Sequence, residues 1–116
     1  MTYFDISVAA APSDGKDAYI AFAKKTGKIF REHGALQVID TWGDDIPDGQ
    51  VTDFKKAVAL KDGETVAVGW IAWPDKATRD AAWAILMDPE GPMGGMDMPF
   101  DGKRMIFGAF DTIAES

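Results

Sequence analysis

Two adjacent cations, Lys103 and Arg104, are the polar side chains best placed to recognise a ligand in this sequence. They follow the pair Asp101-Gly102, which is typical of a chain reversal, and they precede an apolar stretch. A guanidinium at the start of an apolar strand needs a carboxylate partner, supplied by a ligand or by the protein itself. Because buried charges are mostly paired within proteins, we favour a structural ion pair for Arg104. Its candidate partners are Asp53, Asp101 and the aspartates of the loop 43–50.

Aromatic and methionine side chains suggest an apolar pocket. Trp42 and Trp73 each end an expected strand beside a loop, where an indole commonly lines a pocket. Met96 and Met98 belong to a glycine-rich loop, 88–98, and methionine adapts readily to different ligands. We therefore predict ligand contacts at Trp42, Trp73, Met96, Met98, Lys103 and Arg104. The alternative is that the indoles only fill the core and the loop is an ordinary mobile segment.

Metal and histidine chemistry find little support. His33 is the only histidine, which excludes a multi-histidine metal site and a histidine-centred triad, and we expect it to end a helix. The acidic loop from Asp44 fails as a calcium loop, because Ile46 and Lys55 stand where oxygen ligands are needed. Phosphate-binding glycine motifs are absent as well. We predict no metal site, expect no cofactor, and interpret the aspartates as turn-forming and solvating residues.

Composition narrows the class of protein. The 116 residues carry a formal net charge of −7, which disfavours nucleic acid and anionic membranes as partners. There is no cysteine, as is common in a reducing cytoplasm, and no apolar run is long enough to span a membrane. The first residues also lack the pattern of a signal peptide. We expect one cytoplasmic domain, residues 1–116.

These side chains must be positioned by seven extended or helical segments. Alternation of apolar residues predicts strands, and apolar residues three and four apart predict helices. Ser13 or Asp14 is expected to cap the first helix, Gly34 to end it, and Asp75 to cap the second. The expected order is strand 3–11, helix 15–33, strand 35–42, extended segment 54–60, strand 65–73, helix 75–88 and strand 105–110.

This order is the split βαβ pattern of an α+β, ferredoxin-like fold, with an antiparallel sheet and two helices on one face. Residues 36–60 form either two strands or one long strand interrupted by the acidic loop. We favour the interrupted strand, because it preserves the strand directions that the two crossovers require. The strand 105–110 is apolar on both faces, so we expect it to be central and covered by helices and by a partner. The other sheet face would expose apolar residues, which predicts a homodimer through that face.

Several segments carry a resemblance to a known family. They are Val51-Thr52-Asp53-Phe54, Gly69-Trp70-Ile71, Arg79-Asp80-Ala81 and, above all, the stretch 98–106. Together they are similar to the YbaA-like bacterial proteins, which are defined only as a domain of unknown function. The resemblance implies a dimeric α/β barrel, and it implies no activity, substrate or catalytic residue.

Three functions fit these observations. The first is a dimer that binds a small molecule in a pocket between sheet and helices, walled by Trp42, Trp73 and the methionine loop. The second is a cofactor-independent monooxygenase or isomerase, which rests on fold analogy alone. The third is a non-catalytic oligomerisation or regulatory module. Whether the protein is an enzyme stays open at this point.

Overall fold

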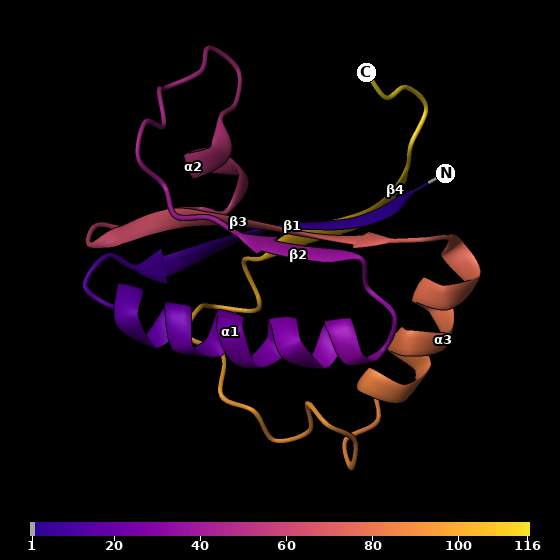
Figure 1. Cartoon of the computed structure of the whole chain (residues 1–116). Coiled ribbons are helices and arrows are strands. Elements are labelled where there is room, and N and C mark those ends of the chain that lie inside the picture. Colours follow the sequence, from indigo (N-terminus) through magenta and orange to yellow (C-terminus); the bar gives the residue numbers. More distant parts are fainter. Residues whose placement is uncertain (1) are drawn as a thin grey trace.

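The structure, a computed structural model, describes residues 2–116. Its elements are β1 (Tyr3–Pro12), α1 (Lys16–Glu32), β2 (Gln37–Asp40), α2 (Phe54–Ala57), β3 (Glu64–Trp73), α3 (Lys76–Leu86) and β4 (Ile106–Asp111). The strands form one sheet in the order β2-β3-β1-β4, and all neighbours are antiparallel. Figure 1 shows α1 and α3 on one face of this sheet and α2 on the other. The predicted ferredoxin-like arrangement is confirmed.

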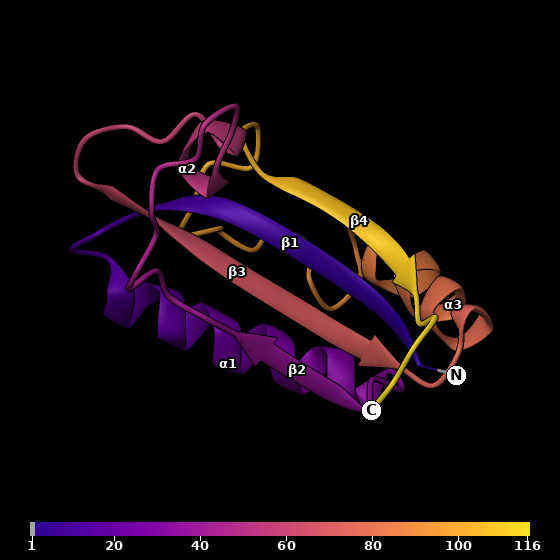
Figure 2. The same cartoon turned by 90° about the horizontal axis from the view of Figure 1, so that it is seen from above.

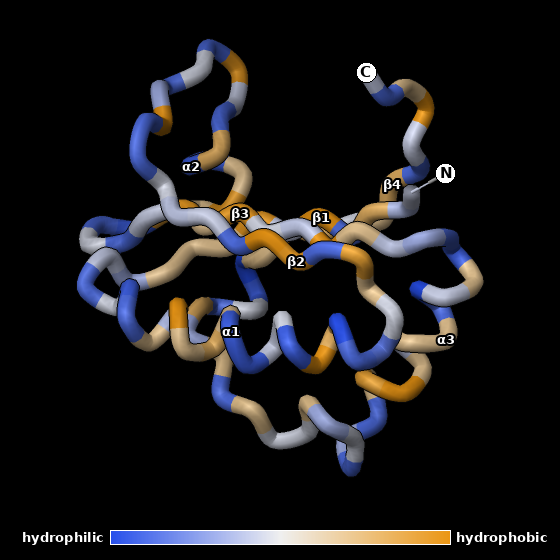
Figure 3. Tube along the Cα trace, in the orientation of Figure 1, coloured by the Kyte–Doolittle hydropathy of each residue, from blue (hydrophilic) through white to orange (hydrophobic). Residues whose placement is uncertain are grey.

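The two central strands explain the stability of the sheet. β1 and β3 pair along ten residues each, from Tyr3 opposite Trp73 to Pro12 opposite Glu64. Residues directly opposite each other share a face, so the alternation in one strand is matched in the other. Ala9, Ala10 and Ala11 in β1 are almost completely buried. Figure 3 shows hydrophobic residues gathered along the strands, whereas α1 and the loop that carries α2 alternate between hydrophilic and hydrophobic residues.

The helix ends follow the predicted signals in two of three cases. Asp75 caps α3, since its carboxylate accepts a hydrogen bond from the Thr78 backbone at 2.8 Å. Gly34 follows α1 with φ +106°, a conformation that glycine adopts readily. The prediction that Ser13 or Asp14 caps α1 is wrong, because the N-cap is Gly15 and no side chain caps the helix. The turn is closed by backbone instead, from Gly15 N–H to Pro12 O at 3.0 Å.

Residues 54–60 do not form a strand. Asp53 accepts a hydrogen bond from the Lys56 backbone at 2.7 Å and so caps a single helical turn, α2. Val58 and Leu60 then pack on the sheet face that α1 and α3 leave uncovered. The preferred interpretation of residues 36–60 as one interrupted strand is therefore wrong, and only the short β2 joins the sheet. Local capping prevails here because an aspartate cap satisfies orphan backbone donors that an edge strand would leave unpaired.

β4 is an edge strand rather than the expected central strand. It pairs only with β1, and none of its residues is buried. Figure 2 shows β4 at one margin of the sheet and β2 at the other. The helix layer does not cover it, so Phe107 is 77% exposed on that side. The two-sided apolar pattern predicted coverage, but the chain itself supplies none.

Candidate functional site

Arg104 forms the structural ion pair that the sequence favoured. Its Nη1 and Nη2 donate to the two carboxylate oxygens of Glu64 at 2.8 and 2.7 Å, and its Nε donates to Asp101 at 2.8 Å. Nη1 also donates to the Ala59 carbonyl at 3.0 Å. These hydrogen bonds lower the pKa of Glu64 to about 2. The guanidinium thus fastens the turn before β3 to the turn before β4, and its partners belong to the protein.

Sequence reasoning found Asp101 as a partner of Arg104 and missed Glu64. Both Arg104 and Glu64 side chains are only 16% exposed. The signal for Glu64 lay in its position directly after the Asp62-Gly63 turn, at the start of a buried strand. A carboxylate there needs a cation as much as Arg104 needs an anion.

The other predicted ligand contacts do not meet at one place. Trp42 packs against Tyr19, with ring centroids 5.3 Å apart, beside Phe100. Trp73 is completely buried in a separate cluster with Phe30. The backbone near Trp42 pairs with the opposite end of β3, where Gly43 N–H donates to Val66 O. The two indoles therefore do not wall one pocket.

Lys103, Met96 and Met98 lie on or near the surface of the segment between α3 and β4. Lys103 is exposed, and its backbone N–H donates to Asp101 at 3.0 Å. Met98 is 54% exposed and borders a pocket of about 430 Å³ with Pro99 and Phe100. The carboxylates of that pocket, Glu64 and Asp101, are those already bound to Arg104.

His33 and the acidic loop take structural roles. The His33 Nδ1 lies 2.9 Å from the Ile29 carbonyl at the C-terminal end of α1. Asp48 pairs with Lys55, and Asp53 caps α2, which lowers the pKa of Asp53 through hydrogen bonds from the Lys56 and Gly49 backbones. Across residues 2–116, no group of three or more metal-binding side chains is found.

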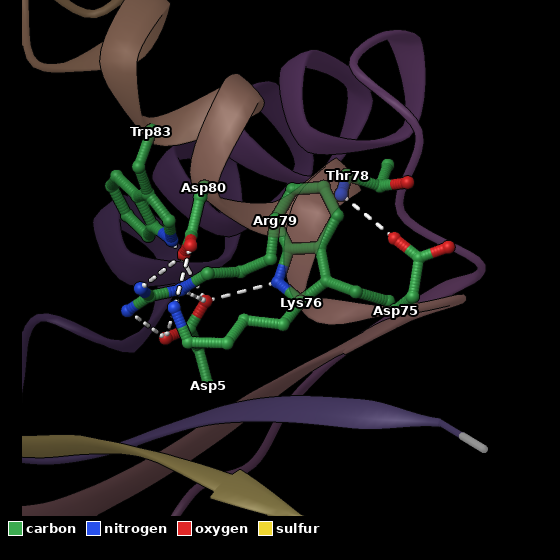
Figure 4. Close-up of polar contacts among 8 residues, drawn as sticks. Asp5, Asp75, Lys76, Thr78, Arg79, Asp80 and Trp83 are labelled. Carbon is green, nitrogen blue, oxygen red and sulfur yellow. Dashed lines mark hydrogen bonds and ion pairs between the residues drawn. The ribbon is translucent and has the colours of Figure 1, made fainter.

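A polar cluster around one carboxylate lies under α3 and was not predicted from the sequence. We call it the Asp5 cluster. It consists of Asp5 in β1, Trp73 at the end of β3, and Arg79 and Trp83 in α3 (Figure 4). Both indole N–H groups donate to Asp5 Oδ2, at 2.9 and 2.7 Å, and Arg79 Nη2 donates to Oδ1 at 2.8 Å. The available signal was a charged residue at an inward position of a strand, which must be paired.

A second carboxylate, Asp40, lies in a groove between α1 and β2. The groove has a volume of about 460 Å³, and the residues lining it include Lys24, Gly27, Lys28, Val38 and Asp40. Asp40 is exposed, and no hydrogen bond or ion pair to its carboxylate is found within residues 2–116. The carboxylate therefore opens to the solvent of the groove. We call this space between α1 and β2 the α1–β2 groove.

The surroundings of Asp40 set its chemistry. Its Oδ1 occupies space beside Gly69, where an added Cβ would lie 2.7 Å away. Asp40 reaches solvent, yet neighbouring protein atoms remove enough water from its carboxylate to raise its pKa. Burial, together with the Asp40 charge, raises the pKa of Tyr19 to about 12. Such a carboxylate can accept a hydrogen bond or a proton from a bound molecule.

The sheet face opposite α1 and α3, which we call the open face, carries several large apolar side chains. The strand register places Phe4, Ile6, Trp70 and Phe110 there. Phe110 is 51% exposed and Ile106, on the same side of β4, is 45% exposed. Val58 and Leu60, in the segment after α2, cover part of it.

An antiparallel sheet in this strand order, with two long helices on one face, defines a ferredoxin-like protein. The crystal structure of a dimeric ferredoxin-like protein from an uncultured marine organism has the same fold, with a TM-score of 0.64 and 14% sequence identity. The similarity covers 99% of this chain and 98% of that chain.

The chain belongs to the family described as Protein of unknown function (DUF1428), which matches residues 2–102. It is 47% identical to Uncharacterized protein YbaA of Escherichia coli strain K12 and to that of Shigella flexneri. Each similarity covers 99% of both chains. The predicted resemblance to YbaA-like proteins is confirmed. Within residues 2–116, no helix is both long and apolar enough to cross a membrane.

Proposed function

We propose that the protein is a homodimer that binds a small molecule between its sheet and its helices. The observation that carries the ligand-binding proposal is the α1–β2 groove with its unpaired carboxylate, Asp40. Ligand sites typically measure 300–1,000 Å³, and this groove of about 460 Å³ combines apolar side chains such as Ile20 and Val38 with charged ones. In the pocket beside Met98, by contrast, the carboxylates are already bound to Arg104.

The open face supports the homodimer. Exposed apolar patches on soluble proteins mark interfaces, and a second copy would bring an equally apolar face. The structural neighbour is described as dimeric. In Figure 1, the loop that carries α2 and the C-terminal residues both rise from this face, at opposite ends, and leave the middle free. We expect the dimer in the cytoplasm, because the chain contains no cysteine.

The dimer is tested with a matched pair of variants on β4. Ile106 faces the open face and Phe107 faces the helix side of the same strand. In light scattering at micromolar concentration, the wild type and Phe107→Glu should both be dimers, while Ile106→Glu should be a monomer, because a charge at the interface core opposes association. A monomeric wild type would overturn the proposal, and so would a dimer that only Phe107→Glu disrupts.

Ligand binding is tested by a thermal-shift and tryptophan-fluorescence screen of metabolites. Gly27 faces Val38 across the groove, so Gly27→Leu should fill the groove and abolish any saturable shift. Ala21→Leu places the same side chain on an exposed part of α1 and should leave binding unchanged. If a metabolite still binds to Gly27→Leu, its site lies outside the groove. Loss of the fluorescence change in Trp42→Ala would then place the ligand beside Trp42, Tyr19 and Phe100.

Two other functions are outcomes of the same screen. Turnover of a hit without added cofactor would favour the monooxygenase or isomerase alternative, which rests on fold analogy alone. A dimer that responds to no metabolite would favour a non-catalytic oligomerisation or regulatory module. The unpaired Asp40 in a groove of ligand size is the reason that we place small-molecule binding first.

A further inference from the structure

The α1–β2 groove is bordered by positive charge in a protein that is acidic as a whole. Five of the 12 Lys and Arg residues lie in α1, although the chain carries a formal net charge of −7. Lys24, Lys28 and Arg31 line the groove, and Asp40 faces it from β2. Cations along one wall and a carboxylate on the other make the groove bipolar.

The two lysines have no counter-charge of their own. Neither Lys24 nor Lys28 forms an ion pair within residues 2–116. They stand four residues apart on one helix face, a spacing at which like charges repel each other. Arg31 is held differently, because its Nη1 donates to the Leu36 carbonyl. An anion between Lys24 and Lys28 would relieve their repulsion.

Two glycines keep space in this region. Gly27 lies in the middle of α1, where glycine weakens a helix, and its added Cβ would point toward Val38 at 3.8 Å, an ordinary contact distance. Gly69 lies within β3, where an added Cβ would meet Asp40 at 2.7 Å. Glycine inside a strand often marks a close approach of another group. Packing therefore does not require glycine at position 27, and a side chain there would take up part of the space that Gly27 lines.

We propose that the α1–β2 groove binds a small carboxylate-bearing molecule through Lys24 and Lys28, while a hydroxyl or ammonium group of the same molecule donates to Asp40. This inference rests on the proposed small-molecule binding and specifies its ligand class. The lysine pair supplies donors for an anion, and Asp40 supplies a charged acceptor in the groove lining with no ion-pair partner within residues 2–116. A ligand with an anion alone would leave the Asp40 carboxylate uncompensated beside a second negative charge.

The test uses three probes of nearly equal shape: succinate, malate and aspartate. They carry hydrogen, hydroxyl and ammonium, respectively, at the same carbon. Calorimetry with the full chain should show aspartate and malate binding about tenfold tighter than succinate, the gain of a charge-assisted hydrogen bond. Binding should weaken with added salt, because the anion is held by exposed lysines.

Variants assign the contacts. Lys24→Ala and Lys28→Ala should each weaken all three probes about tenfold, whereas Lys25→Ala, on the same helix and outside the groove lining, should have no effect. Asp40→Ala should remove the preference for aspartate and malate over succinate. Gly27→Ala should raise the melting temperature while weakening every probe. Circular dichroism confirms that each variant is folded.

Failure of this inference is distinct from failure of the proposed function. If metabolites bind in the broad screen and Gly27→Leu abolishes binding, but the lysine and Asp40 variants change nothing, the ligand class is overturned and the groove stands. Equal affinity for the three probes, or no binding of any of them at 10 mM (about 100 times a typical metabolite KM), also overturns the ligand class. If nothing in the screen binds, both proposals fall.

Discussion

Asp5 and Asp40 are two aspartates on the same face of one sheet, and they are used in opposite ways. Asp5 accepts hydrogen bonds from two indoles and a guanidinium, and its side chain is 14% exposed. Asp40 is exposed, its carboxylate accepts none within residues 2–116, and it lines a groove. Asp5 is fully engaged by side chains of the same chain, whereas the Asp40 carboxylate is free to bind another molecule. Pairing within the chain, rather than residue type, distinguishes architecture from a candidate site.

The largest expected effect is the loss of the Asp5 cluster. Asp5→Asn removes the negative charge that pairs with Arg79 and one of the two acceptor oxygens in a partly buried place, and breaking such a pair should cost about 3 kcal/mol. For a chain of this length, that lowers the melting temperature by about 12 °C. Differential scanning calorimetry measures it. Asp40→Asn is the matched control, and an equal loss in that variant would erase the contrast between the two aspartates.

The ion pair of Glu64 and Arg104 should make stability depend on acid. Hydrogen bonds from Arg104 lower the pKa of Glu64 from 4.5 to about 2, so the folded state is stabilised above pH 4.5 and loses this stabilisation as pH falls toward 2. Glu64→Gln should therefore be less stable than the wild type at pH 7. Urea denaturation at several pH values should show the difference shrinking below pH 4.5; a constant difference would contradict the linkage.

Gly27→Ala should stabilise the fold, unlike most core changes. Alanine is favoured over glycine in a helix by about 1 kcal/mol, and the added Cβ would meet only Val38 at 3.8 Å. The melting temperature should rise by about 4 °C. If it falls instead, the space beside Gly27 is needed for packing, and the argument that it serves a ligand is lost.

The smallest effect is expected at Asp40 itself. Burial raises the pKa of Asp40, so the folded state is favoured while the carboxyl is protonated and loses that advantage as pH rises through the folded-state pKa. Asp40→Asn should be slightly more stable than the wild type at pH 7 and equal to it below the ordinary pKa of 3.8. Denaturation curves at pH 3 and pH 7 measure this. A destabilised Asn variant at pH 7 would mean that Asp40 has a structural partner.

Much of the fold follows from local pattern. The long strands β1 and β3, the apolar stripe of α1 and the Asp75 cap were predicted, because each depends on residues a few positions apart. The segment 54–60 was misassigned, since its alternation competed with an aspartate cap whose partner lies three residues away. The candidate site was harder to predict from the sequence than the fold was. Arg104 was correctly expected to pair, whereas Glu64, Asp5 and the groove at Asp40 were not found.

The sequence by itself determined the four strands, the two long helices, their order and thus the ferredoxin-like fold, because helical and strand periodicity act between near neighbours. It also predicted cover on both faces of the stretch 105–110, which β4 does not have. Only the tertiary structure decided that β4 is an edge strand, that Trp83 reaches an aspartate 78 residues earlier, and that Asp40 stays unpaired. Those facts depend on distances between segments remote in the chain, which periodicity does not encode.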